Sequence, residues 1–462
     1  MVVVGAAALH VWAGYTLPRP WPDESHFIAP ALALVGGDGL SVPELNAPEG
    51  IFWMPSGYYV AQAPLLAVGL DPLAAGRLLS LLGVIVFALA LAAAATRAGV
   101  APVLAFGAVL VWICMPRVVT IANIARMEGP VLALTGVALW CIALDRWRLA
   151  VAAAWLAPLV HPIGLVIAIA VTAAGIVRTP PRPWSRPERI ALGIAGALWV
   201  AQAAYFLANA DLAGAHLGFQ FTRKAGRAIL LQWWHWALLL AAAGGGLAAT
   251  LRARRGDVHL RIVWTLLALT GGFVVIDVVG REMWYEFIGR ETAVLVLVLA
   301  VLAAVAALRY AAPAGRSGRS LVVALSVVAA LGAGVALRQT LTTTWYGMGG
   351  GLASRHEWLT FVDTAIGELD RFDAQDGPAA TVVVDPLSGM GQEIFAHDWR
   401  RLTFVQPTPA TPLPPTAGDY VLATPGAPFV TAELVEPLAV TPPALEVRSR
   451  DGAFVMQLFE RS

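Results

Sequence analysis

The sequence predicts a polytopic α-helical membrane protein with about eleven transmembrane helices, followed by a small α/β domain outside the membrane. Of the 462 residues, 58% are hydrophobic and only 13% are charged, and the mean hydropathy is +0.70. A soluble globular protein does not need so much apolar surface. At about residue 340 the long apolar stretches give way to polar and proline-rich sequence. We therefore divide the chain into a transmembrane domain, 1–340, and an extracytoplasmic domain, 341–462.

The first apolar stretch, Val2–Leu17, is expected to be a retained helix rather than a signal peptide. It has no basic region before it and no clear small-residue cleavage site after it. The polar loop that follows, 18–73, contains two apolar patches, Ile28–Leu34 and Gly57–Leu70. Both patches are too short to cross a membrane, so they are predicted to form interfacial helices on its surface.

Ten further apolar stretches predict transmembrane spans, at 75–96, 101–118, 129–144, 149–160, 162–177, 190–208, 233–251, 262–279, 292–309 and 320–337. The stretch 149–177 fits either one long helix or two short ones that meet at His161-Pro162. Two helices place all the arginine-rich loops on one side of the membrane. The positive-inside rule therefore favours two helices and a cytoplasmic N-terminus. The loop at 18–73 and the C-terminal domain then lie outside a multi-pass inner (plasma) membrane protein.

The C-terminal domain is predicted to contain a helix at Arg355–Phe372 and three short strands, at Thr381–Asp385, Asp419–Ala423 and Ala453–Phe459. It shows no cluster of metal ligands and no phosphate-binding or nucleophile motif, so an accessory role in packing or acceptor recognition is expected. The net charge of +1 gives no indication of a nucleic-acid partner. Cys114 and Cys141 lie in apolar stretches and are interpreted as small hydrophobic residues.

Several ionisable residues are predicted to lie at the same face of the membrane. The adjacent carboxylates Asp23 and Glu24 follow the first span directly. The other candidates at this face are Arg77, Arg126, Glu128, His161, Tyr285 and Arg290. Each alone can be an interfacial or solvated side chain, but their common location favours a functional site. Carboxylates beside arginines suit removal of a proton from a hydroxyl while a phosphate leaving group is stabilised.

An ordered set of motifs carries a family resemblance. The set comprises the Asp-Glu pair after the first span, NAPEGIFWMPSGYY in the loop, AAGRLLSLL at the second span and ARMEGP at the fourth. Together they resemble the GT-C superfamily of membrane glycosyltransferases, especially the protein O-mannosyltransferases and the lipid A aminoarabinose transferases. The resemblance is best over 1–180, weaker to 340 and absent beyond. It implies a sugar donor linked to a polyprenyl phosphate or diphosphate and used on the extracytoplasmic face.

The resemblance also implies roles for individual residues. Asp23 matches the catalytic carboxylate of the family. Arg126 and Glu128 match its second-loop polar motif, with Glu where Asp is common. Tyr285 and Arg290 are the candidates for contact with the lipid phosphate, although WYEFIGRE departs from the usual proline-rich pattern.

The resulting hypothesis is an inverting glycosyltransferase in which Asp23 deprotonates the hydroxyl of a protein, glycan or lipid acceptor. Glu24 and Glu128 would orient Asp23, or carboxylates such as Asp23 and Glu128 would hold Mg²⁺, Mn²⁺ or Ca²⁺. Arg77, Arg126 and Arg290 would bind phosphate, and a groove between spans would hold the lipid tail. A transporter or flippase of a lipid-linked or anionic substrate is the alternative, and a non-catalytic assembly subunit is a third. Paired inverted repeats and broken helices at the membrane midplane would favour the transporter.

Overall fold

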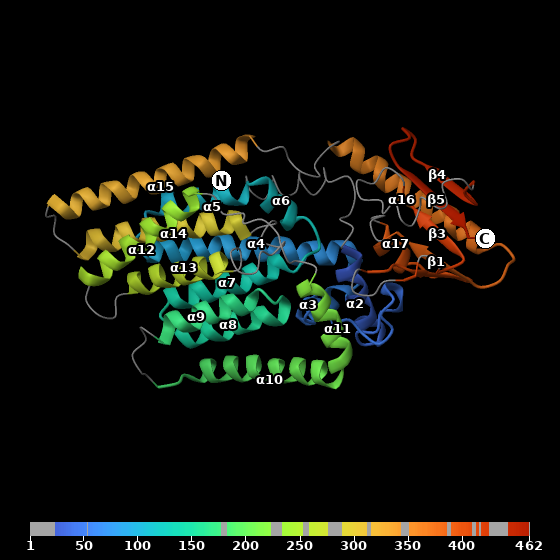
Figure 1. The fold of residues 1–462 in the computed structure, drawn as a ribbon, viewed down its shortest axis with the longest axis horizontal. Coiled ribbons are helices and arrows are strands. Elements are labelled where there is room, and N and C mark those ends of the chain that lie inside the picture. Colours follow the sequence, from blue (N-terminus) through green and yellow to red (C-terminus); the bar gives the residue numbers. More distant parts are fainter. Residues whose placement is uncertain are drawn as a thin grey trace.

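The fold is described from a computed structural model, which defines residues 24–52, 54–176, 183–222, 233–252, 258–275, 289–311, 316–342, 351–385, 390–408, 413–414, 417–424 and 442–461. The predicted first span, Val2–Leu17, lies outside these ranges. A long helical bundle forms one end of the molecule, and a small sheet with its helices forms the other (Figure 1). The two parts meet at the helices of the first predicted loop.

Both apolar patches of that loop are helical, as predicted. Helix α2 spans Glu24–Gly36 and α3 spans Gly57–Ala67, with a short 3-10 helix η1 at Pro43–Leu45 between them. Phe27 of α2 meets Tyr58 of α3 edge to face, with ring centroids 6.0 Å apart. Ile28 and Tyr58 are fully buried. The two helices therefore bury apolar side chains against the protein itself, including the start of the next helix.

The bundle is built from helices that overlap all ten of the later predicted spans. They are α4 Pro72–Arg97, α5 Pro102–Ile113, α6 Pro116–Ala122, α7 Glu128–Ala143, α8 Trp147–Val160, α9 Gly164–Ile176, α10 Arg186–Ala208, α11 Ala210–Thr222, α12 Trp233–Arg252, α13 Val258–Val275, α14 Gly289–Ala311 and α15 Arg316–Thr342. Within the described ranges, four helices are long and apolar enough to cross a membrane, and six shorter apolar helices accompany them. The polytopic helical class is thus supported, while the count of eleven spans stays a prediction.

Prolines set two helix boundaries. The stretch 149–177 forms two helices, as predicted, because His161 precedes Pro162 and adopts extended backbone angles of φ −154° and ψ 140°. A residue before proline is disfavoured in the helical region. The predicted span 101–118 was too long at its C-terminal end. Helix α5 ends at Ile113 and α6 begins at Pro116, because a proline lacks the N–H that would continue the helical ladder.

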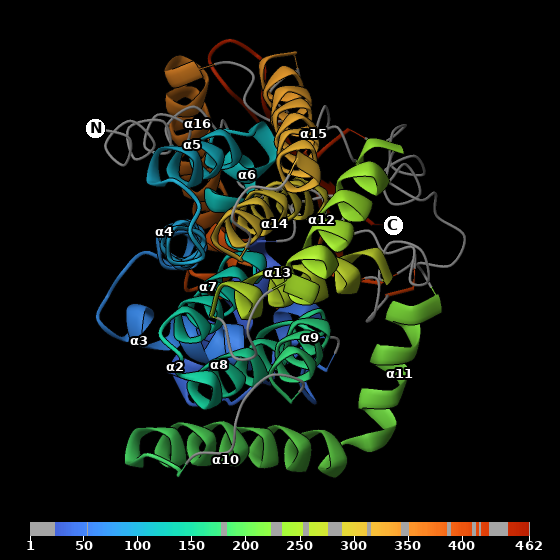
Figure 2. The same cartoon turned by 90° about the vertical axis from the view of Figure 1, so that its left-hand side faces the viewer.

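The helices differ in how far they are enclosed by protein. Of the most apolar window of α14, 89% of the residues are buried, whereas the value for α10 is 6%. Figure 2 shows α10 as a separate layer on one side of the bundle, with α11 rising from its end. A capping box formed by Ser185 and Glu188 begins α10. Helix α14 is therefore a central helix, and the apolar face of α10 suits contact with lipid.

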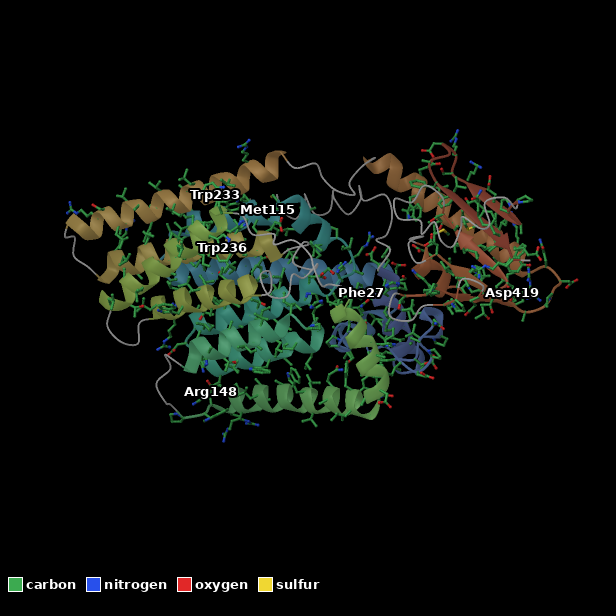
Figure 3. The ribbon with its side chains drawn as sticks, in the orientation of Figure 1. Phe27, Met115, Arg148, Trp233, Trp236 and Asp419 are labelled. Atoms are coloured by element: carbon green, nitrogen blue, oxygen red, sulfur yellow. The ribbon has the colours of Figure 1, made fainter. Side chains whose placement is uncertain are left out.

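Ion pairs tie together the helix ends that carry the predicted cytoplasmic arginines. Arg148 at the start of α8 pairs with Glu188 of α10 at 3.3 Å, and Arg261 of α13 pairs with Asp145 before α8. Arg148 lies at the opposite end of the molecule from Asp419 of the C-terminal domain (Figure 3). The described ends of α8, α10 and α13 that carry these residues thus lie away from that domain, and the side of the membrane on which they lie stays a prediction.

The described part of the C-terminal domain packs two helices and a five-stranded sheet around its own core. Its elements are α16 Gly351–Asp373, β1 Ala380–Val384, α17 Gly391–Phe395, β2 Leu402–Val405, β3 Tyr420–Ala423, β4 Leu445–Arg448 and β5 Val455–Glu460. The strand order is β2-β1-β3-β5-β4, with β2, β1 and β3 parallel and the other pairs antiparallel. The sequence predicted α16, β1, β3 and β5 but missed α17, β2 and β4.

Helices α4 and α7 approach each other closely. A Cβ atom placed on Gly83 of α4 would lie 2.2 Å from the carbonyl carbon and oxygen of Gly129 in α7. A Cβ atom on Gly129 would lie 2.4 Å from the carbonyl oxygen of Ser80. Small residues allow helix backbones in membrane proteins to approach this closely. The two glycines therefore fix the distance between α4 and α7.

Replacement of Gly83 by alanine is expected to destabilise the protein by roughly 1–3 kcal/mol, because the added methyl group forces α4 and α7 apart. The measurement is thermal unfolding of the purified protein in detergent. Gly193→Ala is the matched control, since Gly193 is also inside a helix and a Cβ atom there meets nothing within 4 Å. Equal unfolding temperatures for Gly83→Ala and the wild type would contradict the role of this contact.

Candidate functional site

Glu24, the first residue of α2, is completely buried and accepts three hydrogen bonds from two other segments. Arg77 of α4 donates from Nε to Oε1 and from Nη2 to Oε2, both at 2.9 Å. The backbone N–H of Ala125 donates to Oε1 at 2.6 Å. A planar guanidinium that binds both carboxylate oxygens gives a directional, charge-assisted contact. Glu24 thereby joins the starts of α2 and α4 to the segment before α7.

A second buried ion pair lies beside the first. Arg126 binds Glu128 through Nε, at 3.1 Å and 3.2 Å from the two carboxylate oxygens, and through Nη2 at 3.0 Å from Oε1. Its guanidinium carbon lies 5.8 Å from the centroid of the Phe27 ring of α2. The side chains of Arg126 and Glu128 are 9% and 6% exposed. Buried charges of this kind persist because each is paired.

Ser80 of α4 fixes the backbone of Arg126. Its hydroxyl donates to the carbonyl oxygen of Arg126 at 2.9 Å, and the N–H of Arg126 donates to the same hydroxyl at 3.0 Å. Ser80 is fully buried. Because Ser80 lies one turn from Gly83, these hydrogen bonds depend on the close approach of α4 and α7. The helix contact and the ion pairs therefore form one continuous structure.

Two polar residues of α3 complete this region. The Tyr58 hydroxyl donates to the carbonyl oxygen of Gly76 at 3.3 Å, and Gln62 donates from Nε2 to the carbonyl oxygen of Phe27 at 2.9 Å. Burial raises the pKa of Tyr58 far above its ordinary value, and the charges of Glu24 and Glu128 raise it further. Tyr58 is thus a neutral hydroxyl over the physiological pH range. The phenol can donate a hydrogen bond here but cannot supply a negative charge.

The structure brings together four of the residues predicted for the site, namely Glu24, Arg77, Arg126 and Glu128. Asp23 and Tyr285 lie outside the described residues, as does the side chain of Arg290, whose backbone lies in the first turn of α14. His161 is buried at the end of α8, where Nδ1 accepts from the N–H of Ile163 at 3.2 Å. That bond belongs to the turn between α8 and α9. These four residues therefore keep the status of predictions.

The described carboxylates offer a poor set of ligands for a cation. Both oxygens of Glu24 accept from Arg77, and both oxygens of Glu128 accept from Arg126. Among the residues that the structure describes, no group of three histidine, cysteine, aspartate or glutamate side chains could hold a metal ion. A cation bound at Glu128 would have to displace the guanidinium, so we derive no chemical step through a metal.

An apolar groove runs along the bundle between α5, α14 and α15. It has a cavity volume of about 330 Å³. It extends from Val103 on α5 to Met115, which follows that helix, and from Val294 to Leu302 on α14. Met115 lies toward the end of the bundle that faces the C-terminal domain (Figure 3). Residue 290 lies one helical turn before Val294 in α14. One end of the groove thus lies close to the position predicted to bind phosphate.

Sequence reasoning missed Ser80, Tyr58 and Gln62. Tyr58 is the second-to-last residue of the NAPEGIFWMPSGYY motif, and Ser80 lies inside AAGRLLSLL, three residues after Arg77. The spacing of Arg77 and Ser80 puts both on one side of a helix, which is a signal that could have grouped them. Gln62 carried no such signal because a glutamine within an apolar helix has no preferred partner in sequence.

The fold of the chain is similar to that of ArnT from Cupriavidus metallidurans. The crystal structure of ArnT bound to undecaprenyl phosphate matches with a TM-score of 0.46 and 14% identity, and its apo state matches with 0.45 and 15%. Both matches cover 99% of this chain and 97% of the ArnT chain. No protein-family model matches the sequence, and no curated protein matches it.

Proposed function

We propose that this protein is a membrane glycosyltransferase of the GT-C type. It transfers a sugar from a polyprenyl-phosphate-linked donor to a hydroxyl acceptor at the extracytoplasmic face of the inner membrane. The observation that carries this proposal is the buried network of Glu24, Arg77, Ala125, Arg126 and Glu128. It brings together three of the motifs on which the family resemblance rests. One member of the network, Glu24, directly follows Asp23, the proposed base, in the sequence.

In this proposal the two adjacent acidic residues, Asp23 and Glu24, have different roles. Glu24 is held by three donors and is fully buried, so it is suited to fixing the start of α2 and not to exchanging a proton with an acceptor. Asp23 is the adjacent residue and is therefore carried by the same backbone. In this mechanism Asp23 removes the proton from the acceptor hydroxyl, the oxygen attacks the anomeric carbon, and the polyprenyl phosphate leaves with inversion.

Arg77 and Arg126 supply positive charge next to the base. A guanidinium has five N–H donors, and Arg77 uses one on Nε and one on Nη2 for Glu24. The side chain of Arg77 is 14% exposed. It can therefore hold Glu24 and also donate to a phosphate oxygen of the donor. Such preorganised donors stabilise the charge that develops on a leaving phosphate. Arg290 would add to this charge from α14.

Polar residues at one end of the bundle favour an enzyme over a transporter. Both buried ion pairs lie where α2, the start of α4 and the start of α7 meet. This is the end that contacts the C-terminal domain (Figure 1). A transporter would place its substrate groups near the membrane midplane. The groove between α5, α14 and α15 is apolar over its length and suits a hydrocarbon tail.

Asp23→Asn is expected to lower the rate of sugar transfer by about 10²- to 10⁴-fold, because the variant keeps the shape of the side chain and removes its basicity. The measurement is transfer from polyprenyl-phosphate donors in membranes, with protein level determined in parallel. Asp38→Asn is the matched control, since Asp38 is an exposed residue of the same loop. Wild-type transfer by Asp23→Asn would exclude Asp23 as the base. A purified protein that moves such a lipid across the bilayer without cleaving it would support the transporter.

Arg77→Lys and Arg126→Lys are each expected to raise the KM for the donor by roughly 10- to 100-fold, since lysine keeps the charge but loses the paired hydrogen bonds. Donor kinetics of the purified variants are the measurement. Arg371→Lys provides a control of the same chemistry, because the side chain of Arg371 is 75% exposed and pairs with Glu368 on α16. Unchanged donor KM in both variants would assign the two arginines to folding alone.

Gly107→Leu is expected to weaken use of a long-tailed polyprenyl donor several-fold and to leave a short-tailed donor unaffected. Gly107 lines the groove, and a Cβ atom there meets nothing within 4 Å, so leucine fills space that the tail would occupy without disturbing α5. Gly193→Leu is the matched control on the exposed face of α10. If Gly107→Leu loses the same activity with both donor lengths, or loses no activity with either, the tail does not lie in this groove.

A further inference from the structure

The C-terminal domain contacts the start of α2 through the residue that follows β2. The Ser25 hydroxyl donates to Oε1 of Gln406 at 3.0 Å, across 381 positions of sequence. Both residues are buried, each with 1% of its surface exposed. The backbone N–H of Gln406 donates to the carbonyl oxygen of Glu44 in η1 at 2.6 Å. Gln406 therefore binds the first loop by its side chain and by its backbone.

Helix α17 also packs against Ser25 and Gln406. Gly391 is the first residue of α17, and a Cβ atom on it would lie 2.3 Å from Oε1 of Gln406 and 3.0 Å from Cβ of Ser25. The backbone of α17 thus packs directly against the Ser25–Gln406 hydrogen bond, and a side chain at Gly391 would displace the amide group of Gln406. Two elements of the C-terminal domain, the end of β2 and the start of α17, hold one turn of α2.

This turn also carries the proposed chemistry. Ser25 follows Glu24 and lies two residues after Asp23. The membrane domain holds the turn through the bonds of Arg77 and Ala125 to Glu24. The C-terminal domain holds it through Gln406. A displacement of the turn moves Asp23 with it, and a misplacement of about 1 Å at a reacting group can cost about a hundredfold in rate.

We infer that Gln406 is a positioning residue of the transfer reaction, through which the C-terminal domain fixes the start of α2 and thereby Asp23. This inference rests on the proposed function. It gives the C-terminal domain a defined part in catalysis: the domain supplies one half of the clamp on α2, and the membrane domain supplies the other. Gln406 touches neither substrate in this scheme, and its side chain acts through Ser25.

The kinetic test compares Gln406→Leu with Gln457→Leu in the full-length protein. Gln457 lies on β5 of the same domain, where its Nε2 donates to Glu446. In the sheet, β5 is separated by two strands from β2, the strand next to Gln406. Gln406→Leu is expected to lower kcat about tenfold or more with little change in the donor KM, because the base is misplaced while the arginines stay in position. Gln457→Leu is expected to keep both values. A higher donor KM with unchanged kcat in Gln406→Leu would overturn the inference. The same fall in kcat in Gln406→Leu and Gln457→Leu would also overturn it.

Ser25→Ala provides the second arm, since it removes the donor of the same hydrogen bond with a minimal change of volume. The double variant Ser25→Ala/Gln406→Leu is expected to lose no more activity than the more impaired single variant, as for two residues acting through one contact. Multiplicative losses in the double variant would show that the two side chains act separately and would contradict the proposed clamp.

Amide hydrogen exchange tests the clamp without reference to activity. In purified full-length protein, the α2 peptide is expected to exchange faster in Gln406→Leu than in the wild type or in Gln457→Leu, because local opening of α2 loses one restraint. Unchanged exchange in α2 would overturn the inference even if transfer is confirmed. Faster exchange in a protein that transfers no sugar would uphold the clamp while rejecting the proposed function.

Discussion

The contact between Gly83 of α4 and Gly129 of α7 is the constraint on which the candidate site depends. A carbonyl group of one helix occupies the space where the other would carry a Cβ atom. Only at this distance can Ser80 exchange two hydrogen bonds with the backbone of Arg126. The same approach places the N–H of Ala125 against Glu24. A backbone contact inside the bundle thus determines where the charged groups lie.

Because these ion pairs are buried, the stability of the folded protein depends on both partners of each pair being present. Removing one partner from a buried ion pair leaves an uncompensated charge, which typically costs about 3–5 kcal/mol. Glu24 and Arg77 therefore hold α2 against α4 more firmly than an exposed pair would, because exposed pairs contribute about 0–1 kcal/mol. The pairing also occupies the carboxylate oxygens of Glu24 and Glu128 with hydrogen bonds from arginines. It assigns Glu24 and Glu128 to the framework of the site and concentrates proton transfer, in the proposed mechanism, on Asp23.

The sequence was sufficient for features that depend on local chemistry. Apolar length located the ten later helices, and the preference of a residue before proline for extended backbone separated α8 from α9 at His161. It was insufficient where partners are distant in the chain. Arg77 and Arg126 were predicted to bind phosphate, but their binding to Glu24 and Glu128 could not be read from spacing. The Ser25–Gln406 bond spans nearly the whole chain, and neither residue carries a pattern that indicates the other.

The first turn of α2 shows how the two parts of the molecule are related. Glu24 and Ser25 are consecutive residues of one helix, yet the first is bound by the membrane domain and the second by the C-terminal domain. An accessory domain that only covered the bundle would have no reason to reach this turn with both a strand end and a helix start. Because a side chain at Gly391 would displace the amide group of Gln406, the fit is steric as well as polar. A small rotation of the C-terminal domain would therefore first displace the residues next to Asp23. The proposed reaction is most sensitive to displacement at this position, because Asp23 is the proposed base.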